Sequence, residues 1–238
     1  MNGAAAILQA ARDGDVSLVK CLLSDDPRLV GATDDHLKTP LHWAAEHDHH
    51  DVAQILLDAG ADLEATTSWG ATPFDWAATM GSNKVAELLL ARGAQGMNLV
   101  AAASLGKLDL VCKFLDSGTP LASLARRAVP AGPNDHWVAD SACMKGDVIS
   151  DAFYSACRNG HTAVAGVLLE RGAKINAKGV FGGTALHWAA IGGHKDAVAF
   201  LVAHGADLTI RDTKFDSTPE GWAAESKHEE IRELLHSS

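Results

Sequence analysis

The sequence predicts an all-α protein, organised as a linear array of stacked helix–turn–helix units. A turn residue recurs along the 238 residues at spacings of 34, 33, 25, 54, 33 and 34. After each turn, apolar residues follow the i, i+3, i+4 spacing of a helix with one buried face. Units of this length are stable when they stack on their neighbours. The turn residues are Gly14, Asp48, Gly81, Gly106, Gly160, Gly193 and Lys227.

Each unit begins with a short helix whose small side chains let adjacent units approach closely. The turn that follows usually carries Gly, because a left-handed backbone is cheapest without a Cβ atom, and Asp48 is an acceptable substitute. The second helix then buries an apolar face, as at Val52, Ile55 and Leu56. Alanine pairs mark the first helices, at Ala44-Ala45, Ala77-Ala78, Ala102-Ala103, Ala189-Ala190 and Ala223-Ala224.

Two segments indicate the repeat type. Thr39-Pro40-Leu41-His42-Trp43-Ala44-Ala45 and Thr184-Ala185-Leu186-His187-Trp188-Ala189-Ala190 closely resemble the ankyrin-repeat signature. The resemblance covers nearly the whole chain in about seven units, with degenerate first and last units. It implies an ankyrin-repeat solenoid, a right-handed stack of helix pairs with short β-hairpin fingers and a concave groove. The chain also resembles bacterial ankyrin proteins of unassigned activity.

The middle of the chain departs from the repeat. The spacing of 25 residues between Gly81 and Gly106 is about eight too short, which predicts that the finger between these units is missing. The spacing of 54 that follows is about 21 too long, and the surplus falls within residues 119–147. We therefore expect about four units in residues 1–118, an inserted loop or irregular segment at 119–147, and about three units in 148–238.

Composition narrows the classes of function. The formal net charge of −10 disfavours a nucleic-acid protein, because phosphate binding needs a surplus of Lys and Arg on one face. No uncharged apolar run approaches the roughly 20 residues of a membrane helix, and the N-terminal stretch lacks the basic region of a signal peptide. The four cysteines include no Cys-x-x-Cys pair, so we interpret them as reduced thiols of a cytoplasmic, monomeric protein.

Four of the six tryptophans occupy one register of the repeat, immediately before the alanine pair. Packing within the stack is the favoured interpretation. An aromatic wall along the concave groove is the alternative, and it is compatible with packing. These residues are Trp43, Trp76, Trp188 and Trp222.

Aromatic residues at the finger tips are the candidate partner contacts. Side chains at hairpin tips have few core partners, and large aromatic side chains are common binding hot spots. The candidates are His36, Trp69, Phe181 and Phe215, together with Trp137 from the insertion.

The histidines are interpreted as structural. The resemblance implies that His42 and His187 bond neighbouring loop backbone, and that His49 fills a turn position. The run His47–Asp51 offers imidazole and carboxylate groups to a metal, but it spans a turn, so solvated histidines are favoured. The motifs of phosphate loops, serine hydrolases and zinc proteases are missing, and we expect neither a metal nor a cofactor.

Two functions are distinguished by the sequence, and a third, an array with only a stabilising or helper role, cannot be separated from the first. The favoured one is a protein–protein interaction module or scaffold that binds through its concave groove and finger-tip aromatics. Its acidic surround favours a partner with a basic or mixed surface. The alternative is a small-molecule enzyme, in which segment 119–147 covers the groove as a lid. His42, Asp75 and His187 would then transfer protons, with His136 or Tyr154 as further candidates.

Overall fold

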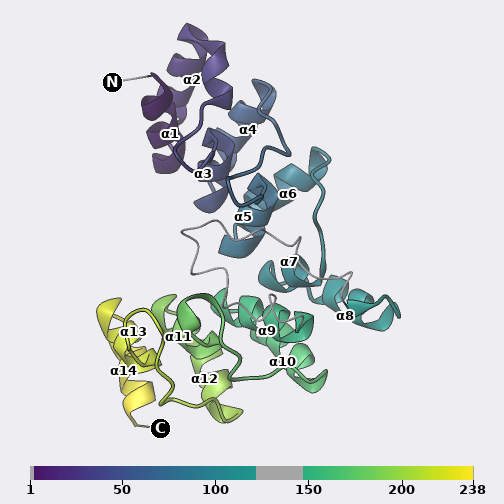
Figure 1. Ribbon diagram of the computed structural model, residues 1–238, viewed down its shortest axis with the longest axis vertical. Coiled ribbons are helices and arrows are strands. Elements are labelled where there is room, and N and C mark those ends of the chain that lie inside the picture. The colour runs from purple at the N-terminus through teal and green to yellow at the C-terminus, as the bar shows by residue number, and fades with distance from the viewer. Residues whose placement is uncertain (1–2, 122–146, 238) are drawn as a thin grey trace. The chain divides into compact units, whose positions relative to one another are not determined.

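The computed structural model describes residues 3–121 and 147–237, and these residues form the predicted array of helices (Figure 1). Within these ranges the single β feature is an isolated bridge between Lys178 and Thr184, so the fingers consist of turns. The helices are α1 (Gly3–Asp13), α2 (Val16–Asp25), η1 (Pro27–Gly31), α3 (Pro40–Glu46), α4 (His50–Asp58), α5 (Pro73–Met80), α6 (Asn83–Ala91), α7 (Leu99–Ser104), α8 (Leu108–Asp116), α9 (Val148–Arg158), α10 (Thr162–Glu170), η4 (Val180–Gly182), α11 (Ala185–Ile191), α12 (Lys195–Ala203), α13 (Pro219–Glu225) and α14 (Glu229–His236).

The chain divides into two compact units, residues 1–96 and 97–238. The first unit stacks the pairs α1/α2, α3/α4 and α5/α6, and the second stacks α7/α8, α9/α10, α11/α12 and α13/α14. In both units each first helix packs on the first helix of the next pair, as α3 does on α5 and α11 on α13. The division expected from the sequence places residues 97–118 in an N-terminal block, whereas in the structure α7 packs on α9 and α8 on α10.

A threonine fixes the start of the first helix in several pairs. The Thr39 hydroxyl accepts a hydrogen bond from the His42 backbone N–H, while the His42 ring accepts one from the Thr39 backbone N–H. Thr184 and His187 repeat this reciprocal capping box. Such boxes satisfy two backbone donors that the first turn of a helix leaves unpaired. The sequence motif at these positions therefore determines where each first helix begins.

The turns within the helix pairs need glycine for a reason beyond backbone conformation. Gly160 has a φ of +79°, and a Cβ atom there would lie 2.9 Å from Nδ1 of His194 in the next pair. Gly14 and His49 show the same contact at 2.8 Å. Asp48 has a φ of 55°, and its carboxylate accepts a hydrogen bond from the Val85 backbone N–H of the next pair, at 3.0 Å.

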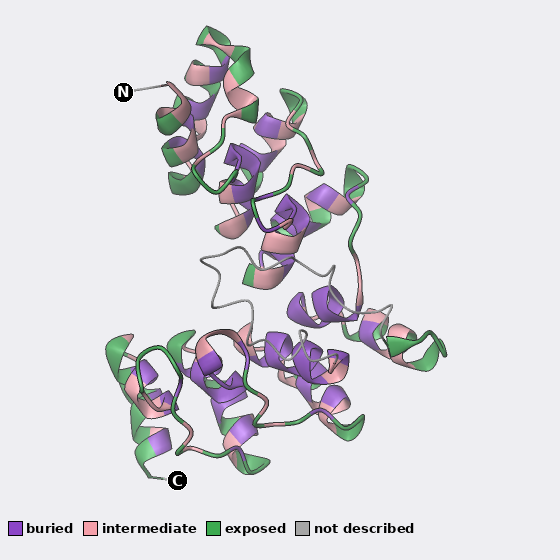
Figure 2. Ribbon diagram, in the orientation of Figure 1, coloured by how far each residue is buried: buried purple, intermediate pink, exposed green. Residues whose placement is uncertain are grey.

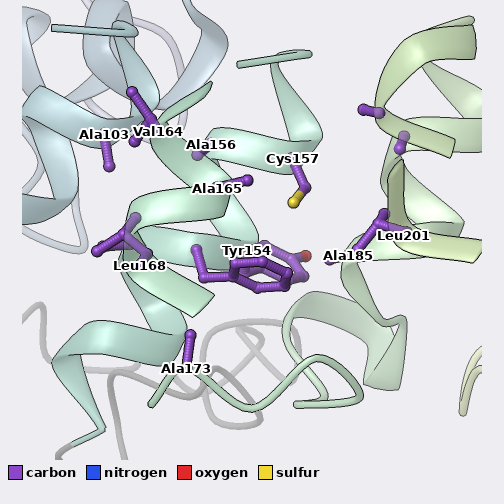
Figure 3. Packing of buried hydrophobic residues seen from close by; sticks show 14 of the residues in the cluster. Ala103, Tyr154, Ala156, Cys157, Val164, Ala165, Leu168, Ala173, Ala185 and Leu201 are labelled. Atoms are coloured by element: carbon purple, nitrogen blue, oxygen red, sulfur yellow. The ribbon is translucent and has the colours of Figure 1, made fainter. Parts of the chain in front are cut away.

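The connection between α6 and α7 contains no finger. It spans residues 92–98, whereas the connection between α4 and α5 spans residues 59–72. Buried residues line α7 and α9 over most of their length (Figure 2). Figure 3 shows the Tyr154 ring of α9 among small buried side chains, including Ala156, Ala165 and Ala185. Small side chains permit the close approach of neighbouring helices here, as the alanine pairs predict.

None of the helices in the described part of the chain is both long and apolar enough to cross a membrane.

Candidate interaction surface

Two tryptophans of the first unit hold a lysine between them. The Lys38 Nζ lies 3.9 Å from the ring centroids of both Trp43 and Trp76. Its third contact is the Glu46 carboxylate, with Nζ 2.5 Å from Oε2. Lys38 is 6% exposed, and an ammonium desolvated in this way gains from the negative faces of both rings. Arg12 lies over Trp43 as well, 5.0 Å from the ring centroid.

The corresponding tryptophans of the second unit contact each other directly. Trp188 and Trp222 meet edge to face, with ring centroids 5.2 Å apart. Gly183 occupies the position that corresponds to Lys38, and a Cβ atom there would lie 3.2 Å from Nε1 of Trp188. A side chain in place of Gly183 would therefore crowd the indole pair. The cation over Trp188 is Arg158, 4.4 Å from the centroid, and it comes from α9.

The finger tips of the second unit bring two phenylalanines together. The rings of Phe181 and Phe215 lie 6.3 Å apart, and Phe215 is 62% exposed. The Nζ of Lys214 lies 4.1 Å from the Phe181 centroid and 5.1 Å from the Phe215 centroid. We call Phe181, Lys214 and Phe215 the finger platform. It presents an apolar surface and a cation side by side.

A buried carboxylate holds one side of the finger platform in place. Asp212 is 3% exposed, and it accepts hydrogen bonds from the backbone N–H groups of Lys214 at 2.8 Å and Phe215 at 2.6 Å. Its other oxygen accepts from the Ser217 N–H and from Nε1 of Trp222, at 3.0 and 2.9 Å. Burial alone would raise the pKa of Asp212, but these hydrogen bonds hold the pKa below its usual value. Both oxygens of the Asp212 carboxylate therefore accept hydrogen bonds from groups within the fold.

Phe181 is held in a strained backbone conformation. Its φ is 58°, in the left-handed region that a non-glycine residue rarely adopts. The Phe181 carbonyl accepts hydrogen bonds from the backbone N–H and the hydroxyl of Thr213, at 2.7 and 2.8 Å. The fingers at residues 171–184 and 204–218 are thus hydrogen-bonded to each other, which fixes the backbone that carries the Phe181 ring.

The four finger aromatics predicted from the sequence differ in exposure. Phe215 is largely exposed and Phe181 half-buried, and His36 is exposed. Trp69 is 7% exposed, because its ring packs on His36 at 5.4 Å and on Trp76 at 6.3 Å. The premise that finger aromatics have few core partners therefore fails at Trp69. Phe181 and Phe215 also contact tryptophans of the helices, with ring centroids 6.3 Å from those of Trp188 and Trp222. The fifth candidate, Trp137, and the proton-transfer candidate His136 lie outside the described residues.

The four tryptophans proposed as a groove wall are half-buried or buried in the structure. Trp43, Trp76 and Trp188 are half-buried, and Trp222 is buried and bonded to Asp212. The indole N–H groups of Trp76 and Trp188 are buried with no hydrogen-bond acceptor in the described part of the chain. A buried donor without a hydrogen-bond partner costs free energy. These four tryptophans therefore pack against neighbouring side chains of the stack.

The three proton-transfer candidates all form capping boxes. His42 is fully buried, with Nδ1 bonded to Thr39 and Nε2 3.1 Å from the Ala71 carbonyl oxygen. Because Nδ1 accepts the Thr39 N–H, the hydrogen-bond network assigns the proton to Nε2. Burial lowers the pKa of His42 to about 4, and burial also lowers the pKa of His187. The Asp75 carboxylate accepts from the N–H and hydroxyl of Thr72, both at 2.9 Å.

His187 uses its ring nitrogens as His42 does, bonding Thr184 through Nδ1 and the Ser217 carbonyl through Nε2 at 3.1 Å. His42 and Asp75 belong to the first unit and His187 to the second. Tyr154, a further proton-transfer candidate, is buried and packs on Trp188 at 6.5 Å.

The histidine-rich run His47–Asp51 borders an open depression of the first unit. Asp48, His49, His50 and Asp51 line it together with Lys84. His49 uses its Nε2 on the Arg12 carbonyl at 3.0 Å, and the His50 ring pairs with Asp51 at 3.2 Å. Across residues 3–121 and 147–237, no group of three or more His, Cys, Asp or Glu side chains is placed to hold a metal ion.

The sequence reasoning missed the cations. Lys38 and Lys214 define the chemistry of the two aromatic regions, and neither was among the predicted contact residues. The available signal was local, since Lys214 directly precedes Phe215 and Lys38 lies two residues after His36. Periodicity does not report it, because the fingers are irregular loops that follow no helical spacing.

Comparisons with known proteins agree with the repeat architecture. The family model for ankyrin repeats (three copies) matches residues 7–100, 99–212 and 153–238. The serine/threonine-protein kinase VIK of Arabidopsis thaliana is 44% identical over 63 residues, which is 26% of this chain and 14% of the kinase. A putative ankyrin repeat protein of Rickettsia bellii is 41% identical over 63 residues, 26% of each protein.

A longer match is to the human neurogenic locus notch homolog protein 2, 28% identical over 204 residues, 86% of this chain and 6% of that protein. The chain therefore matches a small part of the length of these curated relatives. The crystal structure of the human ASB11 ankyrin repeat domain covers 96% of both chains, with a TM-score of 0.47 and 24% sequence identity.

Proposed function

The chain belongs to the ankyrin-repeat family, and from that premise we propose that it binds a protein partner through its concave groove and the finger aromatics of its second unit. Ankyrin repeats are general protein–protein interaction modules. Fold alone does not establish function, so the proposal depends on the chemistry of the surface. The scaffold role expected from the sequence is part of the same proposal.

The observation that carries the proposal is the exposure of Phe215 on a rigid support. A phenylalanine that is 62% exposed contributes little to the stability of the fold. The Asp212 hydrogen bonds nevertheless fix the backbone that presents it, at 2.6–3.0 Å. An aromatic side chain that is already positioned loses little entropy on binding, which is the property of a hot-spot residue.

The free cysteines bear on the compartment in which the protein would bind its partner. The cysteines that the structure describes, Cys21, Cys112 and Cys157, are unpaired. Unpaired thiols suit a reducing compartment, so we place the interaction in the cytoplasm, with the protein as a monomer. The proposal requires neither a cofactor nor a metal.

The test is affinity capture from the cells that produce the protein, with wild type and the double variant Phe181→Ser/Phe215→Ser as baits. We expect at least one protein to be captured by wild type and lost with the double variant. The matched control is Ile191→Ser, because Ile191 is 37% exposed in the same unit and lies in α11, away from the finger tips. It should capture the same proteins as wild type.

Thermal unfolding separates contact from folding in this experiment. We expect Phe215→Ser alone to lower Tm by less than about 3 °C, because an exposed side chain buries little area on folding. Identical capture by wild type and the double variant would exclude the finger aromatics as the binding surface.

A further inference from the structure

We infer that the finger platform recognises an acidic segment of the partner, in which an apolar side chain is flanked by Asp or Glu. This inference rests on the proposed function, since it names the partner chemistry of the same surface. It follows from the cation at the platform, the state of the acidic groups around it, and the charge of the surrounding fingers.

Lys214 is the group that selects an anion. It is exposed, and its Nζ lies over two aromatic faces and makes no ion pair with any described residue. A ring face stabilises an ammonium without neutralising its charge, so Lys214 can still attract a carboxylate. The charge stands next to the exposed Phe215 ring. A ligand that uses both features needs an apolar side chain and a carboxylate close together in its sequence.

The acidic groups nearest to Lys214 along the chain are already engaged. Asp212 is buried and accepts four hydrogen bonds from its own finger and from Trp222. Asp216 pairs with Arg211, whose Nη1 lies 3.6 Å from Oδ2 and also donates to the Asp216 carbonyl. Neither carboxylate forms an ion pair with the Lys214 ammonium; Asp212 accepts only the backbone N–H of Lys214. The platform therefore keeps a positive charge that an incoming segment can meet.

The fingers of the two units differ in charge. In the second unit, the connections 171–184 and 204–218 carry five Lys or Arg and three Asp or Glu. In the first unit, the connections 26–39 and 59–72 carry two Lys or Arg and five Asp or Glu. The acidic net charge of the chain, which favours a basic partner, thus arises mainly outside the platform. Complementarity at the platform favours an acidic segment.

A peptide-binding experiment on the full chain tests this inference. The probe is a fluorescein-labelled nonapeptide with Leu at its centre and two Glu on each side, and its reference replaces the four Glu with Lys. Fluorescence anisotropy should show wild type binding the Glu peptide at least about fivefold more tightly. A third peptide, with Ser in place of the central Leu, should bind more weakly than the Glu peptide.

Charge reversal at the platform provides the decisive comparison. Lys214→Glu should remove or invert the preference for the Glu peptide. Lys227→Glu is the matched control, because it makes the same charge change in the same unit, at the end of α13 opposite the finger. It should change the affinity for the Glu peptide by less than about twofold. Raising the salt concentration should weaken binding of the Glu peptide to wild type.

Equal affinity of wild type for the Glu and Lys peptides would overturn the inference. So would the absence of binding at about 1 mM peptide, or equal effects of Lys214→Glu and Lys227→Glu. If affinity capture of a partner still depended on Phe181 and Phe215, the proposed function would hold even though this inference had failed. Capture that is unaffected by those two substitutions would instead overturn the proposed function itself.

Discussion

The two units place tryptophans in the same repeat register but use their ring faces differently. In the first unit, Trp43 and Trp76 enclose the Lys38 ammonium, with Nζ 3.9 Å from both centroids. In the second unit, Trp188 and Trp222 contact each other, and Gly183 replaces the lysine. In the second unit a lysine also lies over two rings, but it is the exposed Lys214, and the rings are those of Phe181 and Phe215. The lysine of the first unit is therefore buried between two rings, whereas Lys214 of the second unit is exposed, although Arg158 also lies over Trp188 there.

The charge balance follows the same division. Residues 1–96 contain six Lys or Arg and 14 Asp or Glu, a net charge of −8, and the remaining residues carry −2 of the total of −10. A shared repeat register therefore does not imply a shared surface. Contacts between neighbouring repeats decide which ring faces and which charges remain available.

The largest expected effect is the loss of the carboxylate under the finger platform. Asp212→Ala should lower the free energy of unfolding by about 4 kcal/mol, because it removes four hydrogen bonds and leaves the Trp222 N–H buried and unpaired. Urea unfolding measures this effect. The equivalent change in the first unit, Asp34→Ala, should cost about 1 kcal/mol, since the half-buried Asp34 accepts from the backbone N–H groups of His36 and Lys38 alone. Equal costs would show that the two fingers are supported alike.

The second effect is a loss of stability in acid. The pKa of His42 is lowered from 6.5 to about 4 in the folded chain, so between these values the unfolded chain binds the additional proton. The stability is fully present above pH 6.5 and falls by about 3 kcal/mol as the pH drops towards 4. Burial lowers the pKa of His161, His187 and His194 of the second unit, which act with the same sign.

The matched variant for the acid effect is His42→Gln, which cannot titrate in this range. Urea unfolding at several pH values between 4 and 7 should show a shallower loss for this variant than for wild type. Parallel curves would mean that His42 does not control the acid sensitivity of the first unit.

The third effect concerns the glycine turns. Gly160→Ala should cost about 2–3 kcal/mol, because the new Cβ atom would meet the His194 ring at 2.9 Å as well as the strained backbone. Gly205→Ala is the control, since Gly205 also has a positive φ but nothing lies within 4 Å of its Cβ position. We expect a cost of about 1 kcal/mol there. Thermal or urea unfolding that gives equal costs would assign the whole effect to the backbone.

The smallest effect separates the two lysines. Lys38→Ala should destabilise the chain by about 2 kcal/mol, because it removes a desolvated cation from two ring faces and from Glu46. Lys214→Ala should cost less than about 0.5 kcal/mol, since Lys214 is exposed. Urea unfolding of both variants tests the distinction between an internal and an external cation. If both variants lowered the free energy of unfolding equally, the distinction between an internal and an external cation would be wrong.

The sequence predicted more of the fold than of the surface. The turn spacing predicted the helix pairs and the missing finger between Gly81 and Gly106. Helical periodicity is a local property, so it can be read without coordinates. The exposure of the finger aromatics could not be read in this way. Trp69 and Phe215 have equivalent positions in the repeat and each contacts a ring of the preceding finger and of the following helix, yet Trp69 is 7% exposed and Phe215 is 62% exposed.

The departures from the repeat pattern show the same limit. His42 reaches the carbonyl of Ala71 in the next finger, but no finger follows Asp75, and a short carboxylate completes that capping box. Asp48 stands where all the other turns except the one at Lys227 have glycine, and the next pair presents Ser82 at the position where a histidine ring would need the space. Each exception matches the residue that faces it across a repeat boundary.

The sequence by itself determined the array: its helices, its register, its turns and its acidic net charge. The tertiary structure decided which aromatic faces hold internal cations and which remain exposed. The physical reason is distance along the chain. Lys38 meets Trp76 of the next repeat, and Thr213 bonds Phe181 of the preceding finger at 2.7 Å. Such contacts depend on where loop side chains point, and periodicity does not specify that direction.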